Sequence, residues 1–151
     1  MKTFTSGLIV VLTFLIMSAP AVAQQAGQQQ QMRQMQESQQ MMQKMTQMME
    51  KTHQMTQDMS QRMNQAQNEQ MRNQYQMMHR FGEQMGLTLG NMKNAAERCE
   101  LMLQNREMMQ NQEMRQDMER MQRHLNDMTE QMEEAIQTME RMTQRMRERQ
   151  Q

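Results

Sequence analysis

The sequence predicts an all-α protein built from long amphipathic helices that pack as a helical hairpin, an antiparallel coiled coil. Three observations predict this fold class. Apolar residues recur at alternating spacings of four and three, the residues between them are mostly Gln, Asn, Glu, Lys and Arg, and the single proline lies at position 20. The alternation of four and three is the heptad pattern of coiled-coil helices, and the chain after position 20 contains no proline to break a helix.

The N-terminal residues 1–23 have the features of a secretory signal peptide. Lys2 gives a short positive start, residues 7–17 (GLIVVLTFLIM) form an apolar run too short to span a bilayer, and Ala21 and Ala23 provide a small-residue cleavage site. We therefore expect these residues to be removed and the mature chain to reach a bacterial periplasm. Because no second apolar stretch follows, we expect no membrane insertion after cleavage.

The clearest heptad seam lies in the second half of the chain and predicts a helix over residues 92–149. The motif MERM at position 118 recurs at position 139, three heptads later, which disorder does not produce by chance. The seam consists of Met114, Met118, Met121, Leu125, Met128, Met132, Ala135, Met139, Met142 and Met146.

A similar stripe with one stutter predicts a first helix over residues 32–80. The stripe consists of Met41, Met45, Met48, Thr52, Met55, Met59 and, one residue late, Met63, and the pattern resumes at Met71, Tyr75, Met78, Gly82, Met85, Leu89, Met92, Ala96, Cys99 and Leu103. The segment 81–91 (FGEQMGLTLGN) contains Gly82, Gly86 and Gly90, and each glycine inside a helix costs about 1 kcal/mol. We therefore expect the turn of the hairpin at 81–91. The spacing of four between the glycines also fits a small face that lets two helices approach closely, and periodicity alone leaves one continuous helix open.

Composition argues against an ordinary globular core. Leucine, isoleucine, valine and phenylalanine are rare after residue 23, so little surface is available to offset the chain entropy lost on folding. A two-helix hairpin would leave much of its stripe exposed, and we therefore expect it to dimerise into a four-helix bundle. Residues 24–31 (QQAGQQQQ) are expected to form a flexible tail.

Methionine is the residue that sets this chain apart, with 28 copies among 151 residues. Its thioether sulfur is a soft neutral ligand that suits Cu(I) and Ag(I), and methionines three or four apart share one face of a helix. Neutral imidazole is a competent further ligand, and a turn centred near Gly86 would place His53 opposite position 119 and His124 opposite position 48. The candidate metal ligands are Met42, Met45, Met48, Met49 and His53 in the first helix and Met118, Met121, His124, Met128, Met139 and Met142 in the second.

The same methionines would also make a helical core, since methionine favours helix and fills gaps well. Leu101, Leu103 and Leu125 show that leucine is available to this chain, whereas methionine is used far more often. Packing alone does not explain that preference. The stripe is therefore interpreted as core and ligand field at once.

In composition and in its signal peptide, the chain resembles the methionine-rich periplasmic proteins that bind or buffer copper and silver in metal-resistance systems. The resemblance rests on repeated pairs such as MQKM, MTQM and MERM and covers most of the mature chain. It implies an exported protein that binds Cu(I) or Ag(I) and uses no organic cofactor. Small periplasmic stress chaperones of the Spy/CpxP type are also similar, but their LTxxQ signature is missing, because Leu87 and Thr88 are followed by LGN.

Several function classes find no support in the sequence. No phosphate-binding loop, zinc-ligand spacing or nucleophile with a base is present, so we expect no enzyme. The balance of 17 basic and 17 acidic residues, with 3% aromatic residues, argues against a nucleic-acid partner. Cys99, the single cysteine, is expected to be a small buried residue, with a disulfide between chains or a ligand role left open.

Two further functions remain compatible with the sequence. A coiled-coil binding module or chaperone-like protein would use the flexible methionine surface to hold clients or an envelope protein. A sacrificial protein would let its methionines be oxidised to sulfoxide in place of other targets.

Overall fold

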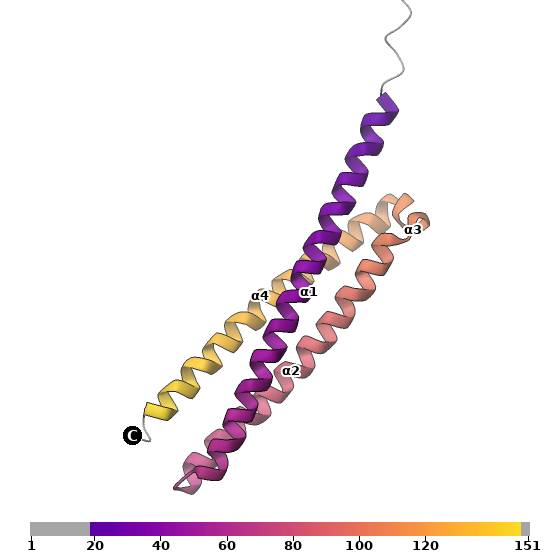
Figure 1. Cartoon of the computed structure of the whole chain (residues 1–151). Coiled ribbons are helices and arrows are strands. Elements are labelled where there is room, and N and C mark those ends of the chain that lie inside the picture. The colour runs from indigo at the N-terminus through magenta and orange to yellow at the C-terminus, as the bar shows by residue number, and fades with distance from the viewer. Residues whose placement is uncertain (1–18, 149–151) are drawn as a thin grey trace, which may run out of the picture. The chain divides into compact units, whose positions relative to one another are not determined.

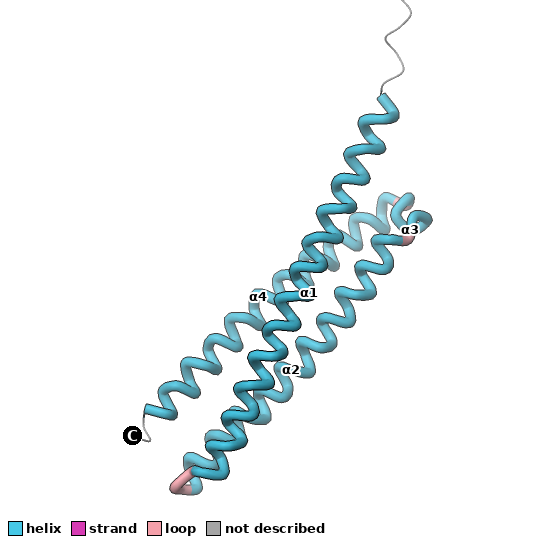
Figure 2. Tube along the Cα trace, viewed as in Figure 1, coloured by secondary structure: helices cyan, strands magenta, loops and turns pink. Residues whose placement is uncertain are grey.

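The computed structural model describes residues 19–148, and this part of the chain is all-α (Figure 1). It contains helices α1 (Ala19–Gln65), α2 (Glu69–Gln104), α3 (Arg106–Gln110) and α4 (Gln112–Glu148). Long helices joined by short connections reverse the chain direction twice (Figure 2). The predicted fold class, all-α with long helices in a helical hairpin, is confirmed, and the structure has three long helices where two were predicted. The predicted signal peptide, residues 1–23, lies outside the described residues except for residues 19–23.

The described part of the chain divides into two units between Gln34 and Met35, and the bundle described below belongs to the second. Residues 24–31, expected to form a flexible tail, are instead part of helix α1. Glutamine and alanine are good helix formers, and only Gly27 opposes the helix in this segment.

The turn between the first two long helices lies at residues 66–68, and the prediction of a turn at 81–91 was wrong. The side chain of Asn68 caps α2, because its Oδ1 accepts a hydrogen bond of 2.8 Å from the main-chain N–H of Met71. Ala66, the first residue of the turn, is buried. The predicted first helix over 32–80 is therefore interrupted after Gln65 by an asparagine cap rather than by glycine.

The glycines of segment 81–91 lie in the middle of α2 and face α1. A Cβ atom on Gly82 would lie 2.5 Å from Cγ2 of Thr56, so only glycine permits this approach of the two helices. At Gly86 and Gly90 the corresponding distances, to Thr52 and to Met49, are 4.0 and 3.9 Å. The alternative interpretation of these glycines, as a small face for close helix packing, therefore describes the structure.

A second connection joins α2 to α4 through the short helix α3, so the helix predicted over 92–149 is also interrupted. Asn105 ends α2 and caps α3, with its Oδ1 accepting from the N–H groups of Glu107 and Met108. Asn111 follows α3, and its Oδ1 accepts from Glu113 at 2.9 Å at the start of α4. Each connection is thus fixed by an asparagine that satisfies main-chain donors a helix leaves unpaired.

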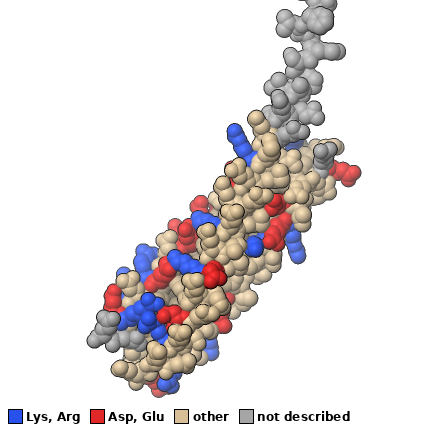
Figure 3. Space-filling model, viewed as in Figure 1, with Lys and Arg blue, Asp and Glu red and all other residues tan. Residues whose placement is uncertain are grey.

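α1 and α4 run parallel, and ion pairs join them at heptad intervals. The pairs are Lys44–Glu133 at 2.6 Å, Lys51–Glu140 at 2.9 Å and Asp58–Arg147, all with the same offset of 89 residues. Asp58 also pairs with Arg62 on its own helix. On the face visible in Figure 3, basic and acidic side chains are interspersed without a patch of one sign.

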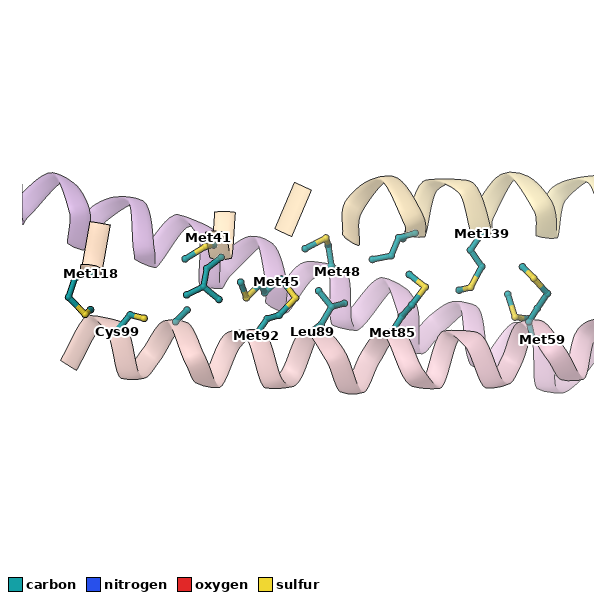
Figure 4. Packing of buried hydrophobic residues seen from close by; sticks show 14 of the residues in the cluster. Met41, Met45, Met48, Met59, Met85, Leu89, Met92, Cys99, Met118 and Met139 are labelled. Atoms are coloured by element: carbon teal, nitrogen blue, oxygen red, sulfur yellow. The ribbon is translucent and has the colours of Figure 1, made fainter. Parts of the chain in front are cut away.

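The core between the three long helices consists mainly of methionine. Figure 4 shows Met41, Met45 and Met92 in the space between α1 and α2, and Cys99 beside Met118. α2 carries an unbroken heptad seam, whose buried residues are Tyr75, Met78, Gly82, Met85, Leu89, Met92, Ala96, Cys99 and Leu103. Among the residues of α1 and α4 whose burial the structure describes, the buried apolar ones are Met41, Met45, Met48, Met59, Met118, Leu125, Ile136 and Met139.

α4 buries its less apolar flank. Toward α1, Thr129 and Thr143 are buried with Gln122 and Ile136, and the threonine hydroxyls donate to main-chain carbonyls four residues earlier. On the opposite flank Met121, Met128 and Met142 are 38%, 43% and 50% exposed. These three methionines were expected within the seam. A two-helix hairpin would give this segment one neighbouring helix. In the structure α4 has two neighbours, α2 and α1, and the flank with Thr129 and Thr143 faces α1.

Candidate methionine site

A groove between α2 and α4 brings five methionines together. Met77 and Met78 line it from α2, and Met139, Met142 and Met146 line it from α4. Its volume is about 860 Å³. We call this feature the methionine groove. It contains more thioethers than any predicted pair would supply.

The five sulfurs of the methionine groove lie at graded depths. Met78 and Met139 are 8% and 1% exposed and form its floor, while Met146 is half-buried. Met77 and Met142 are 65% and 50% exposed and form its rim. The groove is therefore open to a solute from outside, yet its floor is continuous with the core.

The remaining lining residues are an aromatic ring and a sparse polar border. Phe81 lines the groove and is 51% exposed, so part of its ring is accessible from solvent. Glu134 and Arg145 are the two charged lining residues, and their charges balance. The lining contains no histidine and no cysteine, so its soft donors are neutral thioethers.

The predicted ligands of the first helix are divided among the core and two further grooves, one of which is lined by Met42. Met45 and Met48 are 0% and 5% exposed, whereas Met42 and Met49 are half-buried. Met49 and His53 line a groove between α1 and α2, above the glycine face. Nε2 of His53 lies 2.8 Å from the side-chain amide nitrogen of Gln57, so one of its two ring nitrogens already has a hydrogen-bond partner.

The predicted ligands of the second helix are also separated by depth. Met118 is 2% exposed, while Met121, His124 and Met128 are exposed on the flank that faces away from α1. Met139 and Met142 do come together, in the methionine groove. The predicted meetings of His53 with position 119 and of His124 with position 48 depended on the turn at 81–91 and were wrong.

Four groove residues were not predicted, namely Met77, Met78, Met146 and Phe81. Met78 and Met146 belong to the predicted heptad seams, and their heptad positions are the sequence feature that could have identified them as residues facing another helix. The misplaced turn assigned Met78 and Met146 to the wrong neighbours, because it paired residue 78 with the start of the second predicted helix. A search for asparagine caps at Asn68 and Asn111 would have placed α2 against α4.

Cys99 is buried in the core beside Met118 (Figure 4). Burial raises the pKa of its thiol, because desolvation disfavours the thiolate. Within residues 19–148, no three His, Cys, Asp or Glu side chains are grouped as they would be around a hard or borderline metal ion. The soft thioethers of the methionine groove thus form the strongest candidate site.

No family model, curated protein or solved structure matches the chain. Among the described helices, none has a stretch long and apolar enough to cross a lipid bilayer. The residues of the methionine groove and their chemistry are therefore the basis for assigning a function.

Proposed function

We propose that this protein binds a soft monovalent cation, Cu(I) or Ag(I), in the methionine groove and buffers it as an exported protein. One observation carries the proposal: five thioether side chains from two helices line a single groove. Cu(I) and Ag(I) prefer sulfur to oxygen, whereas Zn(II) is typically held by cysteine, histidine or carboxylate. The groove offers the first kind of donor and lacks histidine and cysteine.

The spacing of the groove methionines suits a shared ion. Met139 and Met142 are three apart on α4, and Met146 follows Met142 by four, so all three lie along one face. Met77 and Met78 reach the same groove from α2. Methionine side chains have three rotatable bonds, so the sulfurs that line the groove can turn toward a shared ion.

The groove is a better site for a cation than the methionine core. A charge placed among fully buried side chains such as Met45 would lose its hydration, and the closed core offers it no compensating anion. At the groove, the rim of Met77 and Met142 remains in contact with water, and the carboxylate of Glu134 lines the border. The ring of Phe81 adds a cation–π contact.

The test is a titration of the full-length protein with silver nitrate, followed through the methyl resonances of its methionines. We expect the five groove methyls to shift at micromolar silver. The triple substitution M77L/M142L/M146L conserves volume and removes three sulfurs, so it should weaken binding by roughly tenfold or more while the fold is kept.

The matched control is M121L/M128L, which removes two exposed sulfurs from the same helix outside the groove. It should leave the silver affinity unchanged. Absence of any methyl shift at micromolar silver would refute metal binding. An equal loss of affinity in the control would refute the groove as the site.

A second candidate function is supported by the same surface. Phe81, Met77 and Met142 expose apolar side chains beside one another in the groove, as a site for an apolar peptide would. The triple leucine variant should preserve or strengthen such binding while it weakens silver binding by roughly tenfold or more. The triple leucine variant therefore separates the two functions in one protein.

A further inference from the structure

One layer of the core contains a thiol, a thioether and a hydroxyl, each from a different long helix. Cys99 of α2 is 3% exposed and Met118 of α4 is 2% exposed, and the two side chains lie beside each other in Figure 4. Ser38 of α1 is 1% exposed. We call these three residues the Cys99 layer, and none of them lines the methionine groove.

A hydrogen bond between α1 and α2 places Ser38 at the level of Cys99. The side-chain amide of Gln39 donates to Oε1 of Glu100 at 3.2 Å. Ser38 and Cys99 each come directly before one of these two residues, so they lie at the same height along the two helices. Ser38 also lies three residues before the buried Met41, on the same face of α1. The side chain of Ser38 therefore points into the core.

The hydroxyl of Ser38 has no hydrogen-bond partner, although its oxygen is buried. Buried threonines elsewhere in this core, such as Thr52 and Thr129, donate to the main-chain carbonyl four residues earlier. Leaving a buried hydroxyl unpaired destabilises a protein, and natural cores seldom contain one without a reason. The Ser38 hydroxyl is therefore a hydrogen-bond donor available to a group bound in this layer.

A thiolate removes the charge problem that a cation meets elsewhere in the core. Cys99 is the single cysteine of the chain and its one source of anionic sulfur. A monovalent cation bound to a thiolate forms a neutral unit, so its burial costs far less than that of an unpaired ion. The thioether of Met118 is a second sulfur beside the thiol, and thiolate and thioether are the donors that Cu(I) and Ag(I) prefer.

We propose that the Cys99 layer binds one Cu(I) or Ag(I) ion through the thiolate of Cys99 and the thioether of Met118, with the Ser38 hydroxyl donating a hydrogen bond to the thiolate sulfur. Binding breaks the S–H bond and forms a bond from sulfur to the metal. The proton leaves to the solvent, and no electron is transferred. The methionine groove binds through neutral thioethers and releases no proton, so the layer is a second site that does not depend on the groove.

Burial affects the free thiol and the metal complex differently. Desolvation raises the pKa of the Cys99 thiol and keeps it protonated in the metal-free protein. A metal ion displaces the proton from a thiol that coordinates it. The buried thiol is therefore a poor nucleophile toward organic reagents but remains a ligand for a soft cation.

A groove on the surface of α1 and α2 adjoins the Cys99 layer. Gln39 lines this groove together with Met42 and the ion pair Lys93–Glu97, whose charged atoms are 3.9 Å apart. Met42 is half-buried and packs against the core cluster that contains Cys99. A soft cation that enters this groove can therefore meet a thioether at Met42 before it reaches the layer.

Calorimetric titration of the full-length protein with silver nitrate tests the proposal, in chloride-free buffers of different ionisation enthalpy. We expect one silver ion to bind with the release of about one proton. C99A should lose this proton-coupled binding, whereas M77L/M142L/M146L should keep it, because these substitutions alter only the methionine groove.

The two sites can therefore fail separately. Silver binding without proton release, which C99A leaves in place, belongs to the methionine groove. A wild-type titration without proton release, or proton-coupled binding that persists in C99A, would overturn the Cys99 layer as a site and leave the groove untouched.

Three further variants distinguish a built site from a lone thiol. M118L conserves volume and should weaken the proton-coupled binding by roughly tenfold or more, and S38A should weaken it by roughly threefold to tenfold. The matched control is L101C in the C99A background, because Leu101 is 66% exposed and the new thiol would lie on the outer face of α2. This control should bind silver more weakly than Cys99 does.

Circular dichroism checks that each variant keeps its helices. Equal silver affinity of the wild type and of the L101C control would overturn the proposal, since any thiol would then serve. Unchanged affinity in both M118L and S38A, with the helices intact, would overturn it as well.

Discussion

The glycine face of α2 gives the sharpest prediction about stability, at Gly82. In the variant G82A the new Cβ would lie 2.5 Å from Cγ2 of Thr56 and 3.3 Å from Cε of Met139. The flexible methionine can move away. Thr56 cannot rotate freely, because its hydroxyl donates a 2.7 Å hydrogen bond to the carbonyl of His53 and its branched side chain is stiff at χ1.

The magnitude follows from two opposing effects. Alanine in place of a helical glycine gains about 1 kcal/mol of helix propensity. Forcing an extra methyl group into a filled interface costs about 1–3 kcal/mol. We therefore expect G82A to lower the free energy of unfolding by about 1 kcal/mol, which moves the melting temperature down by about 2–4 °C in a chain of this size.

The neighbouring glycines are matched controls with the opposite sign. The nearest atoms to a new Cβ at Gly86 and Gly90 lie at 4.0 and 3.9 Å, which are ordinary contacts. G86A and G90A should therefore raise the free energy of unfolding, by up to about 1 kcal/mol each.

Thermal unfolding followed by circular dichroism measures all three variants in the full-length chain. The variant T56S removes the clashing methyl and keeps the hydroxyl, so G82A made in the T56S background should cease to be destabilising. If G82A stabilises the protein as much as G86A does, the close approach of α1 and α2 at this point is refuted.

Three other properties can be checked on the same protein. Burial raises the pKa of Asp58, but hydrogen bonds from Arg62 and Arg147 outweigh this effect and hold the pKa below 3.8. The stabilisation from these pairs is therefore complete above that pH and is lost as the pH falls through the lowered pKa. In urea unfolding curves, D58N should lower the free energy of unfolding by about 0.5–1 kcal/mol at pH 7 and leave it unchanged at strongly acidic pH. A stability difference that does not fade in acid would contradict this. The thiol of Cys99 should react slowly with a thiol reagent in the folded protein and at the normal rate in denaturant, and fast labelling of the folded chain would argue against its burial. Hydrogen peroxide should oxidise exposed methionines such as Met77 before the buried core methionines, as peptide mass spectrometry can show. Equal rates of oxidation at exposed and buried methionines would contradict their different burial.

Periodicity predicted the helices and most of the core, because heptad spacing depends only on which face of a helix is buried. The seam on α2 from Tyr75 to Leu103 was predicted residue by residue. The turns were not predicted, because an asparagine cap such as Asn68 adds one hydrogen bond at a single position and leaves the heptad count almost unchanged. Glycine cost was given more weight than glycine packing, and Gly82 shows that tertiary contact decided the outcome.

The type of candidate ligand, methionine, was predicted from the sequence, but only some of the predicted methionines line the groove. Met139 and Met142 lie in the methionine groove, whereas Met45 and Met48 belong to the core. A ligand pair on one helix follows from sequence alone, but a groove between two helices depends on which helices are neighbours. With the turn misplaced, the meeting of Met78 with Met139 was beyond the reach of the sequence argument.

A core made of repeated methionines creates a problem of register, and the ion pairs between α1 and α4 solve it. If α4 slid by one heptad along α1, each heptad position would again face a heptad position of the other helix. One such slip would bring Lys51 against Arg147, and the opposite slip would bring Asp58 against Glu140. The reversed polarity of the third pair, Asp58–Arg147, therefore makes one alignment of two nearly repetitive helices more stable than its neighbours.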